Sequence, residues 1–328
     1  MCLRNTMLGF CSLLATFIGA SSSAQALEPI SFATDWKAQA EQGGFYQAKA
    51  LGLYEKAGLD VTIRGGGPGV NIPQLLGAGA IDFGMGSNSF IPLNMVRAGV
   101  PAAAVMAAFQ KDPQVLITHP REDIKSLADM KDKPVMIADA SVNAFWVWLK
   151  ARYGFSDRQI RKYTFNLAPF LVNEQAIQQG YVTSEPYTIA EQGGIEPQVF
   201  LLSDFGYPSY AAMVMAQNKL IENRPEIVQA FVNASIEGWR SYIFGDPGPG
   251  NALILQANPD MTQDILDQAS DQMRARAMLV PQDDTAEKIG AMNEARWQAF
   301  FTIMSDNGVY SRELNWRAAF TTRFIGGE

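Results

Sequence analysis

The stretch from Phe32 to Phe90 decides the fold and reads FATDWKAQAEQGGFYQAKALGLYEKAGLDVTIRGGGPGVNIPQLLGAGAIDFGMGSNSF. Three times, an apolar strand is followed by a flexible or hydroxyl-bearing loop and then by a helix. The loops cover residues 38–44, 65–69 and 87–89. Each precedes a helix start, where free backbone N–H groups and the positive end of the helix dipole face solvent. We therefore expect the three loops to form one ligand-holding edge of a parallel α/β sheet.

The pattern continues to residue 109 and predicts a first α/β domain. Expected strands cover residues 59–63, 81–85 and 103–109, and expected helices cover 44–57, 70–76 and 90–98. Gly58 follows the first helix as a C-terminal stop. This alternation is typical of a mainly parallel sheet with helices on its faces.

A second run of strands and helices occupies residues 115–202. Its expected strands are 115–118, 134–138, 163–165, 180–183 and 198–202. Its expected helices are 124–130, 142–153, 171–178 and 186–192. The run therefore predicts a second sheet domain.

After a strand at residues 211–216, almost everything reads as helix, at 225–244, 251–257, 262–279 and 285–305. Helices alone cannot build a third α/β unit. We therefore expect the chain to return to the first domain and to add a strand and a helical cover there. The predicted first lobe is 27–112 with 206–328, the second is 113–205, and crossings near 111–114 and 203–208 form a two-stranded hinge.

Residues 1–26 have the features of an export signal. Arg4 supplies the positive end, residues 7–19 are almost unbroken apolar sequence, and Ala24-Gln25-Ala26 is a small-x-small cleavage site. Both cysteines, Cys2 and Cys11, lie in this segment, so we expect no disulfide, metal or nucleophile to depend on a thiol. The bulky Phe10 before Cys11 argues against a lipid anchor. No later apolar run is long enough for a membrane span, which predicts a soluble periplasmic protein.

The charge balance restricts the partners. Lys and Arg number 26 against 33 Asp and Glu, and removal of Arg4 with the signal leaves 25 against 33, a net charge of −8. An acidic exterior argues against nucleic acid or anionic lipid as a partner. The alternative interpretation is that this acidity merely keeps an exported protein in solution.

Several motifs resemble the periplasmic solute-binding proteins of ABC importers in the nitrate, taurine and alkanesulfonate group, especially the branch that binds thiamine-pyrimidine precursors. The matching pieces are Trp36 before 42–48, then 51–54, 57–61, 79–84, 180–181, 185–187, 204–207 and 234–239. The resemblance covers about residues 30–245. It implies a type II periplasmic binding protein fold, with two α/β lobes on a two-stranded hinge and the C-terminal helices on the first lobe.

Aromatic residues at expected cleft edges suggest a flat ligand ring. Trp36 and Tyr187 are the first choices, and Phe45, Tyr46, Trp146 and Tyr207 are further aromatic candidates. Such ring contacts contribute about 0.5–1.5 kcal/mol beyond burial. The alternative is ordinary packing, which we expect for Phe45 and Trp148 because both follow the helical spacing of other apolar residues.

Two carboxylates, Asp35 and Glu185, lie at strand ends and can accept hydrogen bonds from ring N–H or amino groups. A buried carboxylate without a partner is costly, so each requires a donor in ligand or protein. Asp35 alternatively caps a helix or pairs with Lys37, and Glu185 alternatively begins a capped helix. Glu185 ranks first because the resemblance places residues 185–187 in a pocket-facing loop.

Small polar residues and glycines form the expected polar end of the site: Gly66, Gly67, Ser87, Asn88, Ser141 and Asn143. Their N–H and O–H groups suit an oxyanion, although any strand-to-helix turn favours the same residues as caps. Sulfonate or nitrate carriers are expected to add a guanidinium, and only Arg64 lies beside these loops. A nitrogen heterocycle therefore ranks above a small anion.

No cofactor or metal is expected. The single histidine, His119, has no other ligand at suitable spacing and is expected at a domain crossing without a chemical role. Nucleophile elbows, phosphate loops and Cys-His pairs are absent from the sequence. Members of the resembling branch usually have a histidine where this chain has Gln42, and their enzymatic relatives also use a cysteine-rich loop. The resemblance therefore argues against an enzyme, while keeping Gln42 as a candidate ligand-binding residue.

The predicted function is capture of a small pyrimidine-like molecule by hinge closure, followed by delivery to an ABC permease with its ATPase. We expect a monomer. Three alternatives stay open: a thiamine-pyrimidine biosynthesis enzyme on the same fold, a sulfonate- or nitrate-type anion binder, and a sensor that presents its ligand to a receptor.

Overall fold

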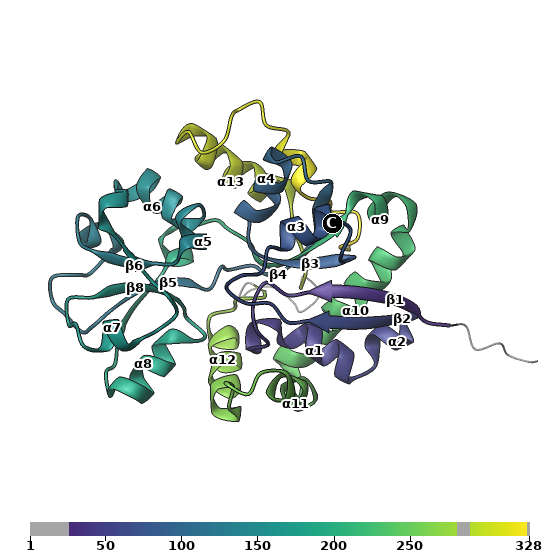
Figure 1. The fold of residues 1–328 in the computed structure, drawn as a ribbon, viewed down its shortest axis with the longest axis horizontal. Coiled ribbons are helices and arrows are strands. Elements are labelled where there is room, and N and C mark those ends of the chain that lie inside the picture. The colour runs from purple at the N-terminus through teal and green to yellow at the C-terminus, as the bar shows by residue number, and fades with distance from the viewer. Residues whose placement is uncertain (1–25, 281–288, 327–328) are drawn as a thin grey trace, which may run out of the picture.

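The computed structural model describes residues 26–280 and 289–326, which form two five-stranded sheets covered by helices (Figure 1). The first sheet contains β1 (Glu28–Ala33), β2 (Leu59–Arg64), β3 (Phe83–Asn88), β4 (Ala102–Phe109) and β10 (Ala211–Gln217), in the order β2-β1-β3-β10-β4. The second contains β5 (Gln114–Thr118), β6 (Val135–Ile137), β7 (Ile160–Lys162), β8 (Ile177–Tyr181) and β9 (Gln198–Leu201), in the order β7-β6-β8-β5-β9.

The strand β10 confirms the predicted return of the chain to the first sheet. It lies between β3 and β4 and runs antiparallel to both, with Met213 opposite Gly86 on one side and Ala107 on the other. A strand covered on both faces is expected to read as a continuous apolar run. The sequence AAMVMAQ of β10 has this form, and Met213 and Met215 are fully buried.

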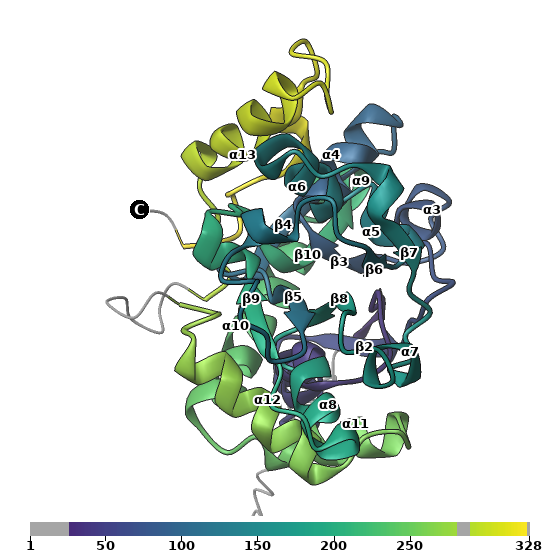
Figure 2. The ribbon, with the colours of Figure 1, turned by 90° about the vertical axis from the view of Figure 1, so that its left-hand side faces the viewer.

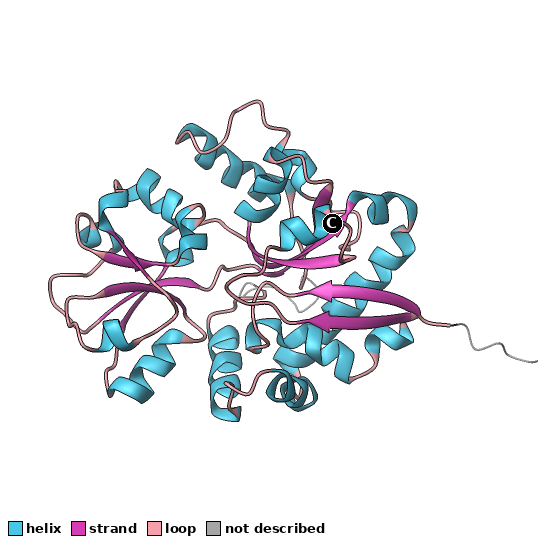
Figure 3. Cartoon of the chain, in the orientation of Figure 1, coloured by secondary structure: helices cyan, strands magenta, loops and turns pink. Residues whose placement is uncertain are grey.

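Helices pack on both sheets (Figure 3). Those of the second sheet are α5 (Asp139–Val142), α6 (Phe145–Tyr153), α7 (Ala168–Leu171) and α8 (Glu185–Gly193). The others are α1 (Gly43–Ala50), α2 (Leu53–Lys56), α3 (Ile72–Gly77), α4 (Phe90–Arg97), α9 (Asn218–Asn223), α10 (Pro225–Phe244), α11 (Gly248–Ala257), α12 (Gln263–Ala275) and α13 (Glu294–Asp306). No helix of the described residues has both the length and the apolar content needed to cross a membrane.

Close packing of α1 against α10 explains the glycines of the Gln42-Gly43-Gly44 motif. A Cβ on Gly44 would lie 2.1 Å from the Trp239 ring, and a Cβ on Gly238 would lie 2.2 Å from the Gly44 carbonyl oxygen. Both are below any real contact, so the two helices approach only because these positions lack a side chain. This packing positions the start of α1 and the 3₁₀ turn η1 (Ala40–Gln42) before it.

Several predicted elements in the first half of the chain are corrected. The first helix is interrupted at Gly52, whose φ of +64° is left-handed, while Gly58 ends α2 as predicted. The predicted helix at 124–130 is only a 3₁₀ turn, η2 (Leu127–Met130). Trp146 is not at a cleft edge: it is fully buried, and its Nε1 donates to Asp157 at 3.0 Å. The expected burial of Phe45 and Trp148 is confirmed.

Further corrections concern the second sheet and the C-terminal helices. The strand expected at 163–165 is β7, three residues earlier, and α7 and β8 replace the helix at 171–178 and the strand at 180–183. His119 follows the end of β5 that is distant from the crossing, and its Nε2 lies 2.8 Å from the Phe170 carbonyl oxygen. Of the helix expected at 285–305, residues 285–288 lie outside the described residues, and α13 begins only at Glu294 because Asn293 caps it.

The chain passes between the sheets twice, between β4 and β5 and between the 3₁₀ turn η4 (Leu202–Phe205) and β10. Arg296 of α13 donates to carbonyl oxygens of both connections: Gln110 at 2.5 Å, Pro208 at 3.0 Å and Ser209 at 2.8 Å. We call Arg296 with these three residues the hinge clamp. The predicted lobe boundaries at 112/113 and 205/206 fall in the two connections, and movement of the lobes as separate bodies stays a prediction.

Candidate ligand-binding site

The segment Asp35–Trp36 leaves the carboxyl end of β1 and is held by the glycine-rich loop. The Gly66 amide donates to the Trp36 carbonyl oxygen at 2.9 Å, and a Cβ on Gly66 would lie 2.2 Å from the Thr34 carbonyl oxygen. Gly66 is therefore needed because two backbones meet there, and in this structure its N–H already has a protein partner. Gly67 has open space at the position of a Cβ.

The Asp35 carboxyl is buried without a compensating donor at one oxygen. Its Oδ1 has no hydrogen-bond partner within the described part of the chain. Burial raises the pKa of Asp35 to about 7, and the charge of Glu41 adds to this, while nearby backbone N–H groups and the Ser87 hydroxyl act in the opposite direction. Lys37, the alternative partner, instead pairs with Asp260 at 2.8 Å.

The ring of Trp36 meets an aromatic ring from the second sheet's side of the molecule. The ring centroids of Trp36 and Phe165 are 4.6 Å apart, and Phe165 follows β7 with a left-handed φ of +59°. Left-handed backbone is unfavourable for a bulky residue, and 42% of the Phe165 surface is exposed. The contact with Trp36 therefore accompanies a strained backbone at Phe165 and a Phe165 ring that is partly exposed.

Glu41 forms a second link between the two sides. The Thr183 hydroxyl donates to Glu41 Oε1, and Gln268 Nε2 of α12 donates to the Thr183 carbonyl oxygen at 2.5 Å. Figures 1 and 2 both show α12 beside α8, the helix that follows Thr183. Burial raises the pKa of Glu41, although the Thr183 hydroxyl and a backbone N–H stabilise the charged form. The loop between β8 and α8 therefore docks on the first lobe through a buried carboxyl.

Glu185 begins α8 but turns back onto the strand before it. Its Oε2 accepts the Tyr181 amide at 2.8 Å, and its Oε1 accepts the Tyr163 hydroxyl at 3.3 Å. A Cβ on Gly180 would lie 2.9 Å from the Glu185 Cβ, so glycine is needed there. Burial raises the pKa of Glu185 to about 7, opposed by these donors and increased by Glu41. Glu185 is thus the first residue of a helix, as the alternative interpretation expected, and its carboxyl also accepts hydrogen bonds from Tyr181 and Tyr163.

Asp112 supplies a further buried carboxyl from the first hinge connection. Its side chain is 2% exposed, and its Oδ1 accepts the Gln114 amide at 3.0 Å. Burial raises the pKa of Asp112 to about 7, against the opposing effects of the Gln114 amide, the Ser209 hydroxyl and the Arg296 charge. Tyr181 lies within reach of three of these carboxyls. Burial raises the pKa of its phenol most, and the charges of Asp112, Asp35 and Glu41 raise it further.

The structure brings together some of the predicted residues and leaves others apart. Asp35, Trp36, Ser87 and Glu185 belong to the group just described, and Tyr207, buried with an unpaired Oη, is coupled to Asp112. Tyr187 is half-buried in α8, where burial and then the charges of Glu191 and Asp264 raise its pKa, and its ligand role stays a prediction.

The remaining predicted residues serve local structure. Gln42 accepts the Gln39 amide at 3.0 Å in a helix-start box, and Asn88 accepts the Phe90 amide at 3.1 Å. Ser141 lies in α5, Asn143 follows it with an exposed side chain, and no contact described here joins either of them to Asp35. Their ligand roles stay predictions.

Sequence reasoning missed Glu41, Asp112, Tyr163, Phe165, Tyr181 and Thr183. Glu41 lies in the predicted polar loop, and Tyr181 lies in the quoted Gly180-Tyr181 motif, so both carried a signal. Asp112 and Phe165 carried none, because their positions depend on the hinge and on a β-strand that was placed too late. Among the described residues, no group of three or more His, Cys, Asp or Glu is arranged to hold a metal ion.

Comparison with known proteins gives the family and the fold class. The family model described as NMT1/THI5 like matches residues 39–248, more than half of the chain. The chain belongs to this family. The riboflavin-binding protein RibY of Chloroflexus aurantiacus is 22% identical over 309 residues, covering 92% of this chain and 87% of the relative. The formylaminopyrimidine-binding protein of Halalkalibacterium halodurans is 22% identical over 285 residues, covering 85% of each.

The fold of this NMT1/THI5-like chain is that of the periplasmic binding proteins. The periplasmic aliphatic sulphonate-binding protein SsuA of Escherichia coli superposes with a TM-score of 0.66 at 17% identity, covering 90% of this chain and 98% of that structure. The predicted fold class and family resemblance are confirmed. The family and these relatives fit a substrate-binding role in ABC import rather than an enzyme.

Proposed function

We propose that this chain is the extracytoplasmic solute receptor of an ABC importer and that it captures a small, flat, nitrogen-containing molecule at the junction of its two lobes. The observation that carries the proposal is the pair Asp35 and Trp36: an aromatic ring beside a buried carboxyl oxygen without a partner. A ring stacks on Trp36 while its N–H group donates to Asp35. Names of two relatives, which specify riboflavin and a formylaminopyrimidine, support the same ligand class.

Hinge closure explains how such contacts reach useful affinity. The two connections between the sheets permit the lobes to separate, and the Thr183–Glu41 and Trp36–Phe165 contacts join them again. A closed pair of lobes excludes water from the ligand and presents a surface that a permease can recognise. We further propose that residues 1–26 are removed on export to the periplasm, and that the protein acts as a monomer with a permease and its ATPase.

The anion-binding alternative has less support. A sulfonate or nitrate carrier needs donors with positive charge, but Arg64 is exposed and the Gly66 amide is already used. The proposed function is tested with the purified protein by a thermal-shift screen of pyrimidines, purines, flavins, sulfonates and aromatic acids. X-ray scattering with and without each hit then measures closure. Profiles that stay the same across the whole library contradict the proposal, as does conversion of a hit into product.

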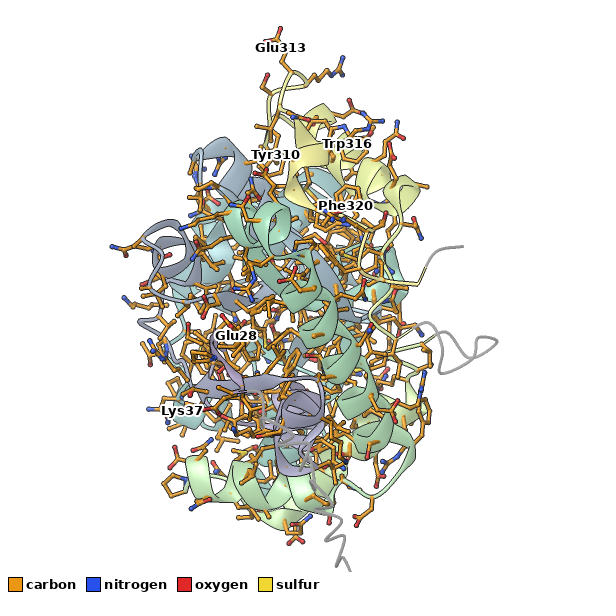
Figure 4. All side chains as sticks on the ribbon, turned by 90° about the vertical axis from the view of Figure 1, so that its right-hand side faces the viewer. Glu28, Lys37, Tyr310, Glu313, Trp316 and Phe320 are labelled. Carbon is orange, nitrogen blue, oxygen red and sulfur yellow. The ribbon has the colours of Figure 1, made fainter. Side chains whose placement is uncertain are left out.

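Replacing Trp36 with alanine is expected to weaken binding of a heterocyclic hit at least about tenfold, because both stacking and buried apolar area are lost. Isothermal calorimetry measures the change. Trp316→Phe is the matched control: Figure 4 shows Trp316 well apart from Lys37, the neighbour of Trp36. Equal affinity of the Trp36→Ala variant and the parent protein would show that Trp36 does not contact the ligand.

A further inference from the structure

Within the described part of the chain, the carboxyl groups at the lobe junction form no ion pair with a Lys or Arg side chain. We call Asp35, Glu41, Asp112 and Glu185 the junction carboxyls. Among residues 26–280 and 289–326, no Lys or Arg nitrogen lies within 4.0 Å of any of their oxygens. Burial raises the pKa of all four carboxyls, and the charge of Glu41 raises those of Asp35 and Glu185 further, while only Asp112 has an opposing positive charge, that of Arg296.

The nearest basic side chains are engaged elsewhere. Lys37 pairs with Asp260, and Lys111 donates to the Arg276 carbonyl oxygen at 3.0 Å. Arg296 influences Asp112 only through space, since its own donors bond the carbonyl oxygens of the hinge clamp. The protein therefore does not neutralise the junction carboxyls with its own described cations.

Two buried polar side chains near these carboxyls also lack a hydrogen-bond partner among the residues that the structure describes, which is an independent sign of a missing ligand. Tyr207 is 2% exposed, its Oη has no hydrogen-bond partner in the described structure, and its titration is coupled to Asp112 and Tyr181. Gln178 is fully buried, and neither amide atom has a partner there. Gln178 shares a face of β8 with Gly180, which Glu185 contacts, because side chains alternate along a strand.

The spacing of the carboxyls favours an organic ligand over a metal ion. The charge of Glu41 acts on Asp35 and Glu185, and Asp112, Asp35 and Glu41 act on Tyr181, yet no group of three or more His, Cys, Asp or Glu in the described residues is arranged to hold a metal ion. Acceptors that do not converge on one point, next to the Trp36 ring, fit a planar group with several N–H donors. Cations over an aromatic face gain further attraction from the ring.

We infer that the site takes its ligand as a cation: a flat nitrogen base with delocalised positive charge, such as an amidinium or a protonated aminoheterocycle. This inference rests on the proposed function and adds the charge of the ligand. The bound cation supplies N–H donors to Asp35 and Glu185 and replaces the counter-charge that the described protein lacks. Charge-assisted hydrogen bonds of this kind are about twice as strong as neutral ones.

The surroundings of each carboxyl define what the cation meets. Asp35 faces Glu41 and the Ser87 hydroxyl. Glu185 faces Glu41, the Tyr163 hydroxyl and the Tyr181 amide. Asp112 faces Arg296, the Ser209 hydroxyl and the two phenols of Tyr181 and Tyr207. Because Asp112 alone has a positive neighbour, we place the cation nearest Asp35 and Glu185.

A series of three probes with one ring and three charges tests the inference. Benzamidinium, benzamide and benzoate differ in charge from +1 to 0 to −1 with little change in shape. Calorimetry on the full protein at pH 7.5 is expected to show benzamidinium binding at least about tenfold more tightly than benzamide, with the weakest binding by benzoate. Binding of benzamidinium is also expected to release protons, seen as a heat that depends on the ionisation enthalpy of the buffer.

Two variants test whether the preference for benzamidinium depends on the junction carboxyls. In Asp35→Asn and Glu185→Gln the advantage of benzamidinium over benzamide is expected to fall severalfold. Glu122→Gln is the matched control because its carboxylate is on the second lobe with 98% of the side chain exposed, so the advantage is expected to stay. Circular dichroism confirms that each variant is folded before binding is measured.

The inference is overturned if benzamide or benzoate binds as tightly as benzamidinium, or if none of the three binds. It is also overturned if neutralising Asp35 and Glu185 leaves the preference intact. Should neutral heterocycles from the library still close the lobes in any of these cases, the proposed function stands and only the ligand charge is wrong. If neither the probes nor the library cause closure, the proposed function fails as well.

Discussion

Arg296→Met is expected to lower the free energy of unfolding by about 3–5 kcal/mol. The Arg296 guanidinium donates three hydrogen bonds to the other residues of the hinge clamp, and it lies 3.9 Å from the centre of the Tyr210 ring. Methionine fills much of the volume but leaves the Gln110, Pro208 and Ser209 carbonyl oxygens without these donors. A buried acceptor left unpaired costs about 1–3 kcal/mol, which gives the expected size. Urea unfolding followed by circular dichroism measures the loss.

Arg312→Met is the control for the Arg296 prediction. Arg312 follows α13, 78% of its side chain is exposed, and its pairing with Asp306 is expected to contribute less than about 1 kcal/mol. Arg296→Lys keeps the charge but cannot reach three oxygens as a planar fork, so an intermediate loss is expected. Unfolding of Arg296→Met at the same urea concentration as the parent protein would show that the clamp does not stabilise the fold.

The hinge clamp illustrates the limit of the sequence for the fold. The return of β10 to the first sheet was predictable, because a lone apolar strand followed only by helices has no other sheet to join. The course of both connections was predictable within a few residues. That α13 braces them was not, since Arg296 and Gln110 are separated by 186 residues and an arginine on a helix normally reads as exposed.

Local errors in the fold have physical causes. The helix expected through Leu53 is broken at Gly52 because a left-handed residue ends the turn. The helix expected at residues 171–178 is only α7, followed by the Gln-rich strand β8. Two buried glutamines, Gln178 and Gln179, hide this strand from an apolar alternation pattern, because polar residues at these positions read as exposed.

The sequence predicted those residues of the candidate site that lie close to the end of a strand. Asp35 and Trp36 come directly after β1, and Glu185 follows β8, so their approach to one sheet edge could be expected. Glu41 could be placed in the same loop but not recognised as buried, because its partner Thr183 is 142 residues away. Gly66 was assigned to ligand binding, and Gly43 and Gly44 were placed in a loop of the ligand-holding edge, whereas the structure requires all three where other groups approach the backbone closely.

Asp112→Asn is expected to raise the free energy of unfolding of the ligand-free protein at pH 8 by about 2–4 kcal/mol, with little gain at pH 4. The pKa of Asp112 is about 7 in the folded protein against 3.8 for the ordinary group, so the folded state holds a proton that the unfolded chain releases. This favours the folded state fully below pH 4, and the advantage is lost as pH rises to about 7. A shift of this size corresponds to about 4 kcal/mol at most.

Asparagine removes the charge while keeping an oxygen for the Gln114 amide, so the variant should show a flatter dependence of stability on pH than the parent. Asp123→Asn is the opposing control: the Asp123 pKa is held low by Arg121 and Lys133, so its stabilising effect is present at neutral pH and is lost as pH falls. Urea midpoints measured below pH 4 show the Asp123 slope, because that effect is lost only below the ordinary pKa of 3.8, and midpoints from pH 4 to pH 8 show the Asp112 slope. A parent protein that gains stability across this range, with an Asp112→Asn variant that loses it at pH 8, would mean that Asp112 is ionised in the folded state and that Arg296, not burial, sets its charge.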